Sequence, residues 1–299
     1  MTNVDRDRYD ILMTTIFCKA SELMKEGQNM RYTIEIDELQ TKIKELGEEL
    51  IIVDVRTNRE AGEMVGAVVL DVKRDISGEA QFFAEPEIIA KRLGEIGIDE
   101  RKTVVFIDNG TNRQSAKVLF AFYQLGHQGG LQILQGGYDS WQEAPIELDY
   151  VQRPAVTYAY NLRKDSVFTF DTIKEALANE TVALIDSRSY ERYAGIKELK
   201  YKKAGHIPGA INFHAKNVFD ESGKWHDKSE LKKIFSSLND KKKVIASCGS
   251  GGSACLNAVA LLEAGFEDVA LYPGGYSEWL DEGEAVATVE DVESDRQKE

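Results

Sequence analysis

The chain has 299 residues, of which 42% are apolar and 29% charged, a composition ample for a folded core and for two domains of about 150 residues each. Its 51 acidic and 37 basic residues give a formal charge of −14, which argues against nucleic acids and anionic membranes as partners and requires a locally basic pocket for any anionic ligand. No apolar run approaches the roughly 20 residues of a membrane span, and the charged start MTNVDRDRYD lacks the pattern of a signal peptide.

The first 30 residues are predicted to form an N-terminal helical extension. Leu12, Ile16, Ala20 and Leu23 recur at helical spacing and mark the apolar stripe of an amphipathic helix. Cys18 lies beside this stripe and is interpreted as a packed apolar residue.

Cysteine and histidine are scarce along the whole chain. Cys18, Cys248 and Cys255 contain no CxxC pair, so we expect no disulfide framework, and a cytoplasmic location fits better. The four histidines show no paired ligand spacing, and we predict no metal site.

The rest of the chain contains the same pattern twice. Each copy has an apolar run ending in Asp-x-Arg, a second apolar run, a loop, a helical pattern, a third apolar run and Gly-Gly-Tyr-x-x-Trp. Asp54 and Arg56 of the first copy match Asp186 and Arg188 of the second. The closing motifs match likewise, and they comprise Gly136, Gly137, Tyr138 and Trp141 in the first copy and Gly274, Gly275, Tyr276 and Trp279 in the second. This order is an internal repeat.

The repeat predicts an α/β fold in each copy. Short apolar runs such as IIVDV, VVFI, VALI and VIAS alternate with helical patterns, which is typical of a parallel sheet flanked by helices on both faces. We place the copies at 31–143 and 165–285, an acidic tail at 286–299 and a linker at 144–164. Pro145 and Pro154 break regular structure in this linker, which we expect to lie against the protein.

The second copy places a thiol at the end of a buried strand. Cys248 follows the run VIAS, and the small residues Gly249, Ser250, Gly251, Gly252 and Ser253 then lead into a helix. Ligands of parallel α/β sheets bind beyond the carboxyl ends of the strands. A glycine-rich loop before a helix can turn successive backbone N–H groups toward one anion. We expect these groups to stabilise a Cys248 thiolate and raise its reactive fraction at neutral pH.

The first copy indicates that this cysteine is there for chemistry. Asp108 stands at the position of Cys248, so the fold does not require a thiol there. Seven positions separate Asp108 from the matching Ser115, against five between Cys248 and Ser253. The alternative interpretation is a small buried residue before a flexible turn. A Cys-x5-Arg phosphatase is disfavoured, because Ala254 stands where that chemistry needs an arginine.

Together with GHIPGA at 205–210 and CGSG at 248–251, the repeat resembles the tandem-domain rhodanese family of sulfurtransferases over about residues 31–285. The resemblance implies two rhodanese-like domains, an inactive first and a catalytic second. It implies no cofactor. It also implies a Cys248 persulfide that carries sulfur from thiosulfate or 3-mercaptopyruvate to cyanide, a small thiol or a protein thiol.

The loop sequence bears on the sulfur donor. Mercaptopyruvate-preferring members tend to carry Cys-Gly-Ser-Gly-Val-Thr-Ala, and this chain has Gly252 and Ser253 in place of the valine and threonine. The residues Gly249, Gly251, Gly252 and Ser253 are therefore assigned to the persulfide loop, with Ser250 assisting by hydrogen bonding. The added glycine predicts a more mobile loop.

The resemblance also assigns candidate substrate-binding arginines. Arg192 stands where the family places an arginine that holds the donor's acidic group. Arg188 is a second candidate, although its match to Arg56 of the inactive copy favours a structural role. The second arginine of mercaptopyruvate enzymes is missing near Leu199, where we consider the flanking lysines Lys197, Lys200, Lys202 and Lys203 as substitutes.

A larger departure lies in the first copy. Mercaptopyruvate enzymes carry a histidine there that is proposed to act with the loop serine, but the stretch MVGAVVLDV at 64–72 has none, and Val65 or a neighbour is expected in its place. The preferred donor therefore stays open. The alternative function is a low-turnover persulfide carrier or partner-binding module.

Three further residues have two interpretations each. His206 is interpreted as stabilising a turn rather than reacting. Cys255 is interpreted as packed, with a resolving thiol as the alternative. Trp225 is considered as a border of the active-site cleft.

Overall fold

The computed structural model describes residues 31–78, 82–144, 146, 148, 153–198 and 200–290. The predicted N-terminal helix, Cys18 and most of the acidic tail lie outside these residues. Within the described part of the chain, no helix combines the length and the apolar character needed to cross a membrane.

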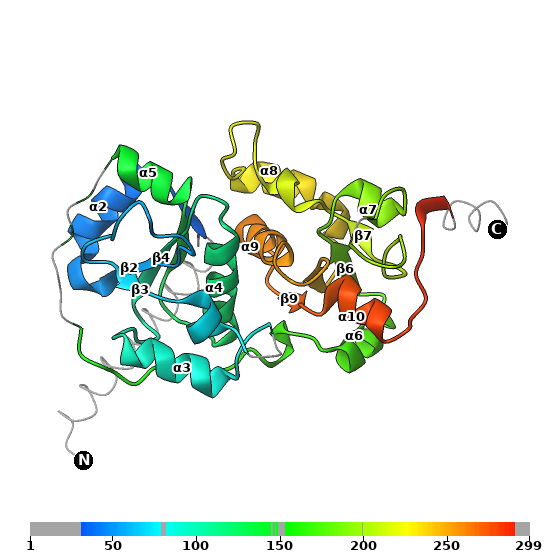
Figure 1. The fold of residues 1–299 in the computed structure, drawn as a ribbon, viewed down its shortest axis with the longest axis horizontal. Helices are drawn as coiled ribbons and strands as arrows, with labels where there is room; N and C mark the ends of the chain where they lie inside the picture. The colour runs from blue at the N-terminus through cyan, green and yellow to red at the C-terminus, as the bar shows by residue number, and fades with distance from the viewer. Residues whose placement is uncertain are drawn as a thin grey trace, which may run out of the picture. The chain divides into compact units, whose positions relative to one another are not determined.

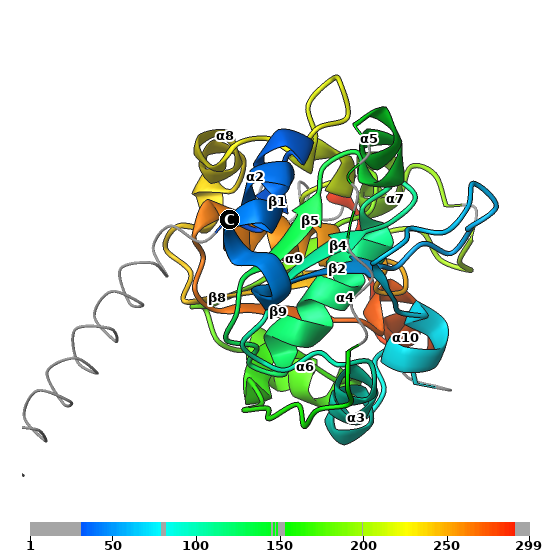
Figure 2. The same cartoon turned by 90° about the vertical axis from the view of Figure 1, so that its left-hand side faces the viewer.

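The first copy is built on a five-stranded parallel sheet with the strand order β1-β5-β4-β2-β3. Figure 2 shows β2, β4 and β5 next to one another. The strands are β1 (Thr33–Ile34), β2 (Leu50–Asp54), β3 (Val68–Val69), β4 (Thr103–Ile107) and β5 (Leu131–Leu134). All of β2 is buried, as expected for a run of apolar residues covered on both faces.

Helices cover both faces of this sheet. They are α2 (Ile36–Leu46), α3 (Pro86–Glu95), α4 (Arg113–Gln124) and α5 (Gly137–Glu143), with short turns η2 (Gly47–Glu49) and η3 (Val72–Ile76). Ile52 of β2 packs in one apolar cluster with Leu39 of α2 and Trp141 of α5. Its neighbour Val53 joins a different cluster with α3 and α4, because successive side chains of a strand point to opposite faces.

The second copy repeats this plan with a four-stranded parallel sheet in the order β7-β6-β8-β9. The strands are β6 (Val182–Asp186), β7 (Ile211–Asn212), β8 (Lys243–Ser247) and β9 (Val269–Tyr272). The helices are α6 (Phe170–Leu177), α7 (Tyr190–Ala194), α8 (Lys228–Ile234), α9 (Ala254–Ala264) and α10 (Gly275–Asp281), with turns η4 (Lys164–Ser166), η5 (Ala215–Val218) and η6 (Ser236–Leu238). Two α/β domains with parallel sheets are therefore confirmed.

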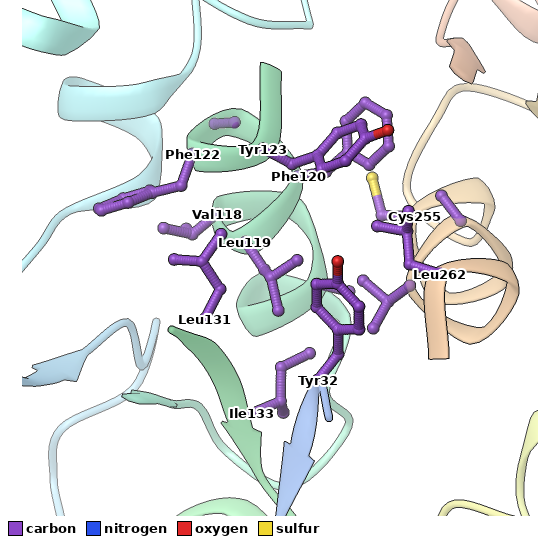
Figure 3. Close-up of a cluster of buried hydrophobic side chains, with 14 of the residues drawn as sticks. Tyr32, Val118, Leu119, Phe120, Phe122, Tyr123, Leu131, Ile133, Cys255 and Leu262 are labelled. Carbon is purple, nitrogen blue, oxygen red and sulfur yellow. The ribbon is translucent and has the colours of Figure 1, made fainter. Parts of the chain in front are cut away.

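The two copies meet through α4 and α9, which lie side by side (Figure 1). Every residue of α9 is buried, and all of them except Asn257 and Glu263 are apolar, as expected for a helix that is covered on all sides. Figure 3 shows Cys255 and Leu262 of α9 facing Phe120 and Tyr123 of α4. One apolar cluster runs through both copies at this contact, so the loops that precede the two helices are held in one packed unit.

The described part of the linker packs on the first copy, as expected. The backbone N–H groups of Val156 and Asn161 donate to the carbonyls of Gly94 and Leu125, and Tyr158 is buried. The Tyr158 hydroxyl lies 2.8 Å from Nδ1 of His127, whose Nε2 lies 2.8 Å from the Lys102 carbonyl. A carbonyl only accepts hydrogen bonds, so the neutral ring carries its proton on Nε2 and accepts from Tyr158 on Nδ1. Burial lowers the pKa of His127 to about 4.

Candidate active site

Cys248 follows the last residue of β8, at the carboxyl edge of the second sheet. Its side chain is 5% exposed, and Ser250 at the tip of the loop is exposed. Gly251 has a φ of +86°, which turns the loop back toward α9 and which a residue with a Cβ rarely adopts. The loop therefore follows the predicted path from the strand to the helix.

The first copy shows how a loop of this kind holds an anion. The buried Asp108 carboxylate accepts hydrogen bonds from the backbone N–H groups of Gly110 (2.9 Å), Asn112 (3.1 Å), Gln114 (3.1 Å) and Ser115 (3.3 Å). Burial raises the pKa of Asp108, and these four hydrogen bonds oppose the rise. The first copy thus fills its own anion site with a side chain.

The second copy has the same loop position without such a filler. Among the hydrogen bonds of the described residues, none has a backbone N–H of Gly249 to Ser253 as its donor. A thiol is a poor acceptor, whereas a thiolate or persulfide is an anion like the Asp108 carboxylate. The comparison of the two loops therefore leaves the N–H groups of the second loop available to a bound anion.

Arg188 belongs to a motif that both copies share. Its guanidinium binds the Asp186 carboxylate at 2.6 Å, donates to the Gly205 carbonyl and stacks on the Tyr276 ring. In the first copy Arg56 does the same with Asp54, Gly62 and Tyr138. The repeated Asp-x-Arg and Gly-Gly-Tyr motifs therefore meet in space, and this geometry gives Arg188 a structural place.

The same register identifies the residue that replaces the missing histidine. Val68 pairs with β2 at the level at which Ile211 pairs with β6, and Gly62 takes the place of Gly205. His206 is therefore matched by Glu63 rather than by Val65. Glu63 is a neighbour of Val65, as the sequence allowed, and the shared residues of AGEMVGA at 61–67 and AGHIPGA at 204–210 give the same alignment as the strand pairing.

Arg192 is half-buried and already has a carboxylate partner. Its Nε and Nη2 donate to Glu198 at 3.1 and 3.0 Å. Burial acts to raise the pKa of Glu198, but the bonds from Arg192 and from two backbone N–H groups hold it below its ordinary value. Arg192 also lines an open hollow of about 510 Å³ with Lys197 and Lys200, two of the lysines considered as substitutes.

Tyr201 connects this hollow to the cysteine loop. Its ring lies 5.3 Å from the Arg192 guanidinium carbon, and its hydroxyl would lie only 2.6 Å from a Cβ placed on Gly249. This hydroxyl is buried and has no hydrogen-bond partner among the described residues. The sequence stretch KYKK gave no signal for this role, because nothing local shows that its tyrosine returns to the loop.

The first copy forms part of the wall of the site. The ring of Phe82 lies so close to Gly251 that a Cβ there would come within 2.4 Å of it, and the Lys117 ammonium lies 4.0 Å from the same ring. Trp225 makes the reciprocal contact, because its indole N–H donates to Asn112 in the loop after Asp108. The loop of each copy is therefore contacted by an aromatic residue of the other copy. Phe82 is the aromatic residue that contacts the Cys248 loop, and the place of Trp225 at the border of the active-site cleft stays a prediction.

Cys255 and His206 have structural surroundings. Cys255 is fully buried in α9, and its Sγ lies 3.6 Å from the Gly251 carbonyl. Burial raises the pKa of Cys255, with Cys248 adding to the rise and Lys117 opposing it, so this thiol stays protonated at neutral pH. His206 is buried, stacks on Tyr193 and lies 2.8 Å from its carbonyl. Both arrangements favour the packed interpretations.

Within the described residues, no group of three or more acidic, histidine or cysteine side chains is placed to hold a metal. The site is made instead of a thiol, backbone N–H groups, a hydroxyl and guanidinium groups. These are groups suited to nucleophilic attack and to the binding of anions.

Comparison with known proteins gives a consistent result. A family model of the rhodanese-like domain matches residues 35–144 and again 169–282. A probable 3-mercaptopyruvate sulfurtransferase of Pseudomonas aeruginosa is 30% identical over 227 residues, covering 72% of this chain and 80% of that protein. A thiosulfate sulfurtransferase of Corynebacterium glutamicum is 26% identical, covering 80% and 81%.

Solved structures agree in fold. SseA from Escherichia coli, described as a 3-mercaptopyruvate sulfotransferase with a rhodanese fold, has a TM-score of 0.65 at 25% identity and covers 83% of this chain and 99% of its own. An anaerobic ergothioneine biosynthesis enzyme from Chlorobium limicola has a TM-score of 0.66 at 24% identity, and the match spans 80% of this chain and 64% of that one. With two family matches and two parallel sheets that repeat one motif, the chain belongs to the rhodanese-like family.

Proposed function

We propose that the protein is a sulfurtransferase that moves a sulfane sulfur from thiosulfate or 3-mercaptopyruvate to a thiophilic acceptor through a persulfide on Cys248. The observation that carries this proposal is the contrast between the two loops. In one loop four N–H groups bind the Asp108 carboxylate. In the matching loop after Cys248, no backbone N–H of residues 249–253 donates a hydrogen bond to another described residue. The names of the relatives support the same activity.

The chemistry balances with either donor. The Cys248 thiolate attacks the outer sulfur of thiosulfate, the S–S bond breaks, and sulfite leaves with the bonding electron pair. With 3-mercaptopyruvate the S–C bond breaks instead, and the thiol proton ends on the methyl carbon of pyruvate. In both cases the product is Cys–S–S⁻, whose charge has moved to the outer sulfur. Cyanide or a thiolate then takes that sulfur and returns the Cys248 thiolate.

The loop N–H groups of Gly249, Gly251, Gly252 and Ser253 stabilise the thiolate and the persulfide in this scheme. Ser250, exposed at the tip, donates a hydrogen bond to the leaving group. Arg192 and Tyr201 hold the acidic group of the donor, with the Tyr201 hydroxyl as the nearer group to the loop. Arg188 is assigned a structural role and no contact with the donor.

Two observations support the alternative function, a low-turnover persulfide carrier. Cys248 is only 5% exposed, and Glu63 replaces the histidine that mercaptopyruvate enzymes place in the first domain. Both features fit a low-turnover persulfide carrier that exchanges sulfur with one protein partner. In either case the acceptors are cyanide, a small thiol or a protein thiol, and a cytoplasmic location stays a prediction.

Turnover measurements test the proposal. The protein is supplied with thiosulfate or 3-mercaptopyruvate and with cyanide, and thiocyanate is measured for the native chain, Cys248→Ser and Cys255→Ser. We expect thiocyanate from the native chain and from Cys255→Ser but none from Cys248→Ser. Thiocyanate formed by Cys248→Ser would remove the proposed nucleophile.

A further inference from the structure

Arg113 of the first copy reaches the cysteine loop of the second. It is the first residue of α4, and its Nη2 donates to the Ser253 hydroxyl at 2.8 Å. Ser253 is the last residue of the loop before α9. The inactive copy therefore supplies a cation to the active loop.

This guanidinium differs from the other arginines around the site. Arg188 is bound by Asp186, Arg192 by Glu198 and Arg59 by Asp54. Arg113 is exposed, and among the ion pairs of the described residues it has no carboxylate partner. Its charge is therefore available to an incoming anion.

Arg113 has a second cation, Lys216, in its electrostatic surroundings. Burial lowers the pKa of His214, Lys216 and Arg113 lower it further, and Glu191 opposes them. A protein with a formal charge of −14 repels anions in general and needs such a spot to receive one.

Arg113 lies in the stretch from Asp108 to Ser115 of the first copy, which is two residues longer than the matching stretch of the second copy. Asn112 takes the left-handed conformation, with a φ of +54°, immediately before α4 begins. Its side chain accepts the indole N–H of Trp225 at 2.8 Å, so a contact from the second copy fixes the residue next to Arg113. Contacts from both copies therefore fix the position of the backbone that bears the Arg113 side chain.

We infer that Arg113 binds the anionic end of the sulfur donor, so that the donor site is shared between the active and the inactive copy. Ser253 engages one nitrogen of the guanidinium, which leaves other N–H groups for a sulfonate or carboxylate oxygen. The inference rests on the proposed function and gives the first copy a role in it.

The test measures donor binding apart from sulfur transfer. Thiosulfate is titrated calorimetrically into Cys248→Ser protein, alone and combined with Arg113→Ala, Arg113→Lys or Arg101→Ala. Arg101 is the control because its exposed side chain belongs to the first copy and makes only ion pairs of 3.7 Å. We expect Arg113→Ala to weaken thiosulfate binding about tenfold or more, Arg113→Lys to weaken it less, and Arg101→Ala to leave it unchanged.

Single-turnover loading of the otherwise native chain completes the test. Arg113→Ala should raise the thiosulfate concentration for half-maximal persulfide formation by a similar factor and leave the cyanide dependence unchanged. Three results would overturn the inference. The first is that Arg113→Ala in the Cys248→Ser background changes the thiosulfate affinity by less than twofold. The others are that Arg113→Ala changes only the cyanide dependence, or that Cys248→Ser binds no thiosulfate. Thiosulfate binding that needs Arg113 without any persulfide would instead contradict the proposed function and leave the inference standing.

Discussion

At the scale of single residues, two adjacent glycines of the cysteine loop have different reasons to be glycine. Gly251 has a positive φ and lies against the Phe82 ring, whereas a Cβ on Gly252 would meet nothing within 4 Å. The expectation that Gly252 adds mobility to the loop agrees with that open space, because no packing restrains the residue.

This difference predicts opposite effects on stability. Gly252→Ala should raise the free energy of unfolding by about 0.5 kcal/mol, because alanine narrows the unfolded ensemble without a clash. Gly251→Ala should lower it by more than about 1 kcal/mol, because the left-handed conformation and the Phe82 contact both disfavour a Cβ. Chemical denaturation of the two variants measures the contrast, and equal effects would show that the loop does not have this geometry.

The unpaired hydroxyl of Tyr201 gives a second prediction. Tyr201→Phe removes a buried polar group without a partner, so the melting temperature should stay the same or rise. The donor concentration for half-maximal persulfide formation should increase severalfold, because the hydroxyl no longer binds the donor's acidic group. The matched control is Tyr193→Phe, whose hydroxyl donates to the Ala210 carbonyl at 2.8 Å. It should lose about 1 kcal/mol of stability. A destabilised Tyr201→Phe with unchanged donor dependence would contradict this role.

The sequence predicted the site residues that are local to one motif and missed those that come from elsewhere. Cys248, the glycines of the loop that follows it and Arg192 each belong to a short, uninterrupted sequence motif. Arg113, Phe82 and Tyr201 reach the loop only through the packing of distant segments, and no spacing in the sequence encodes that approach.

At the scale of elements, the Asp-Arg-Tyr motif at the end of β2 and of β6 separates structural from substrate-binding arginines. Arg188→Ala should lower the free energy of unfolding by about 3 kcal/mol or more, because it leaves the buried Asp186 without its guanidinium partner. Arg56→Ala should lower it less, because Asp54 keeps Arg59 at 3.3 Å. Arg192→Ala should change stability less, since the buried Glu198 keeps Arg188 at 3.5 Å as a cationic partner, and should weaken donor capture. Denaturation curves together with donor titrations distinguish these outcomes. A weakened donor affinity in a fully stable Arg188→Ala would return Arg188 to the substrate site.

The contact between the linker and the first copy predicts a pH dependence. The pKa of His127 is about 4 in the folded chain and about 6.5 when unfolded, so between these values the unfolded chain binds more protons. Stability from this group is therefore fully present above about pH 6.5 and is lost as the pH falls toward 4, by up to about 3 kcal/mol. His127→Gln should show a shallower loss of stability over that window in denaturation measured against pH. A slope equal to that of the native chain would contradict the assignment.

The long strands were predictable and the short edge strands were not. The runs that became β2, β4, β6 and β8 are apolar and β-branched, whereas β1, β3 and β7 have two residues each and no pattern long enough to read.

At the scale of the whole molecule, the loop of the first copy shows what the matching loop of the second copy can bind. Both loops share the strand end, the following helix and the neighbouring Asp-Arg-Tyr motif, but one contains a carboxylate and the other a thiol. The packing of α4 against α9 then joins the loops, so that Phe82 and Arg113 of the first copy become part of the site of the second. The repeat in the sequence predicted the duplication, and the structure adds that the two copies are complementary.

The central claim is that main-chain N–H groups of residues 249–253 hold an anionic sulfur at Cys248. The most direct measurement is a crystal structure of the protein loaded with thiosulfate. The account predicts a second sulfur on Cys248 that accepts hydrogen bonds from several of these N–H groups, as the Asp108 carboxylate does in the first copy. A loaded protein whose outer sulfur lies among apolar side chains, with those N–H groups directed elsewhere, would contradict it.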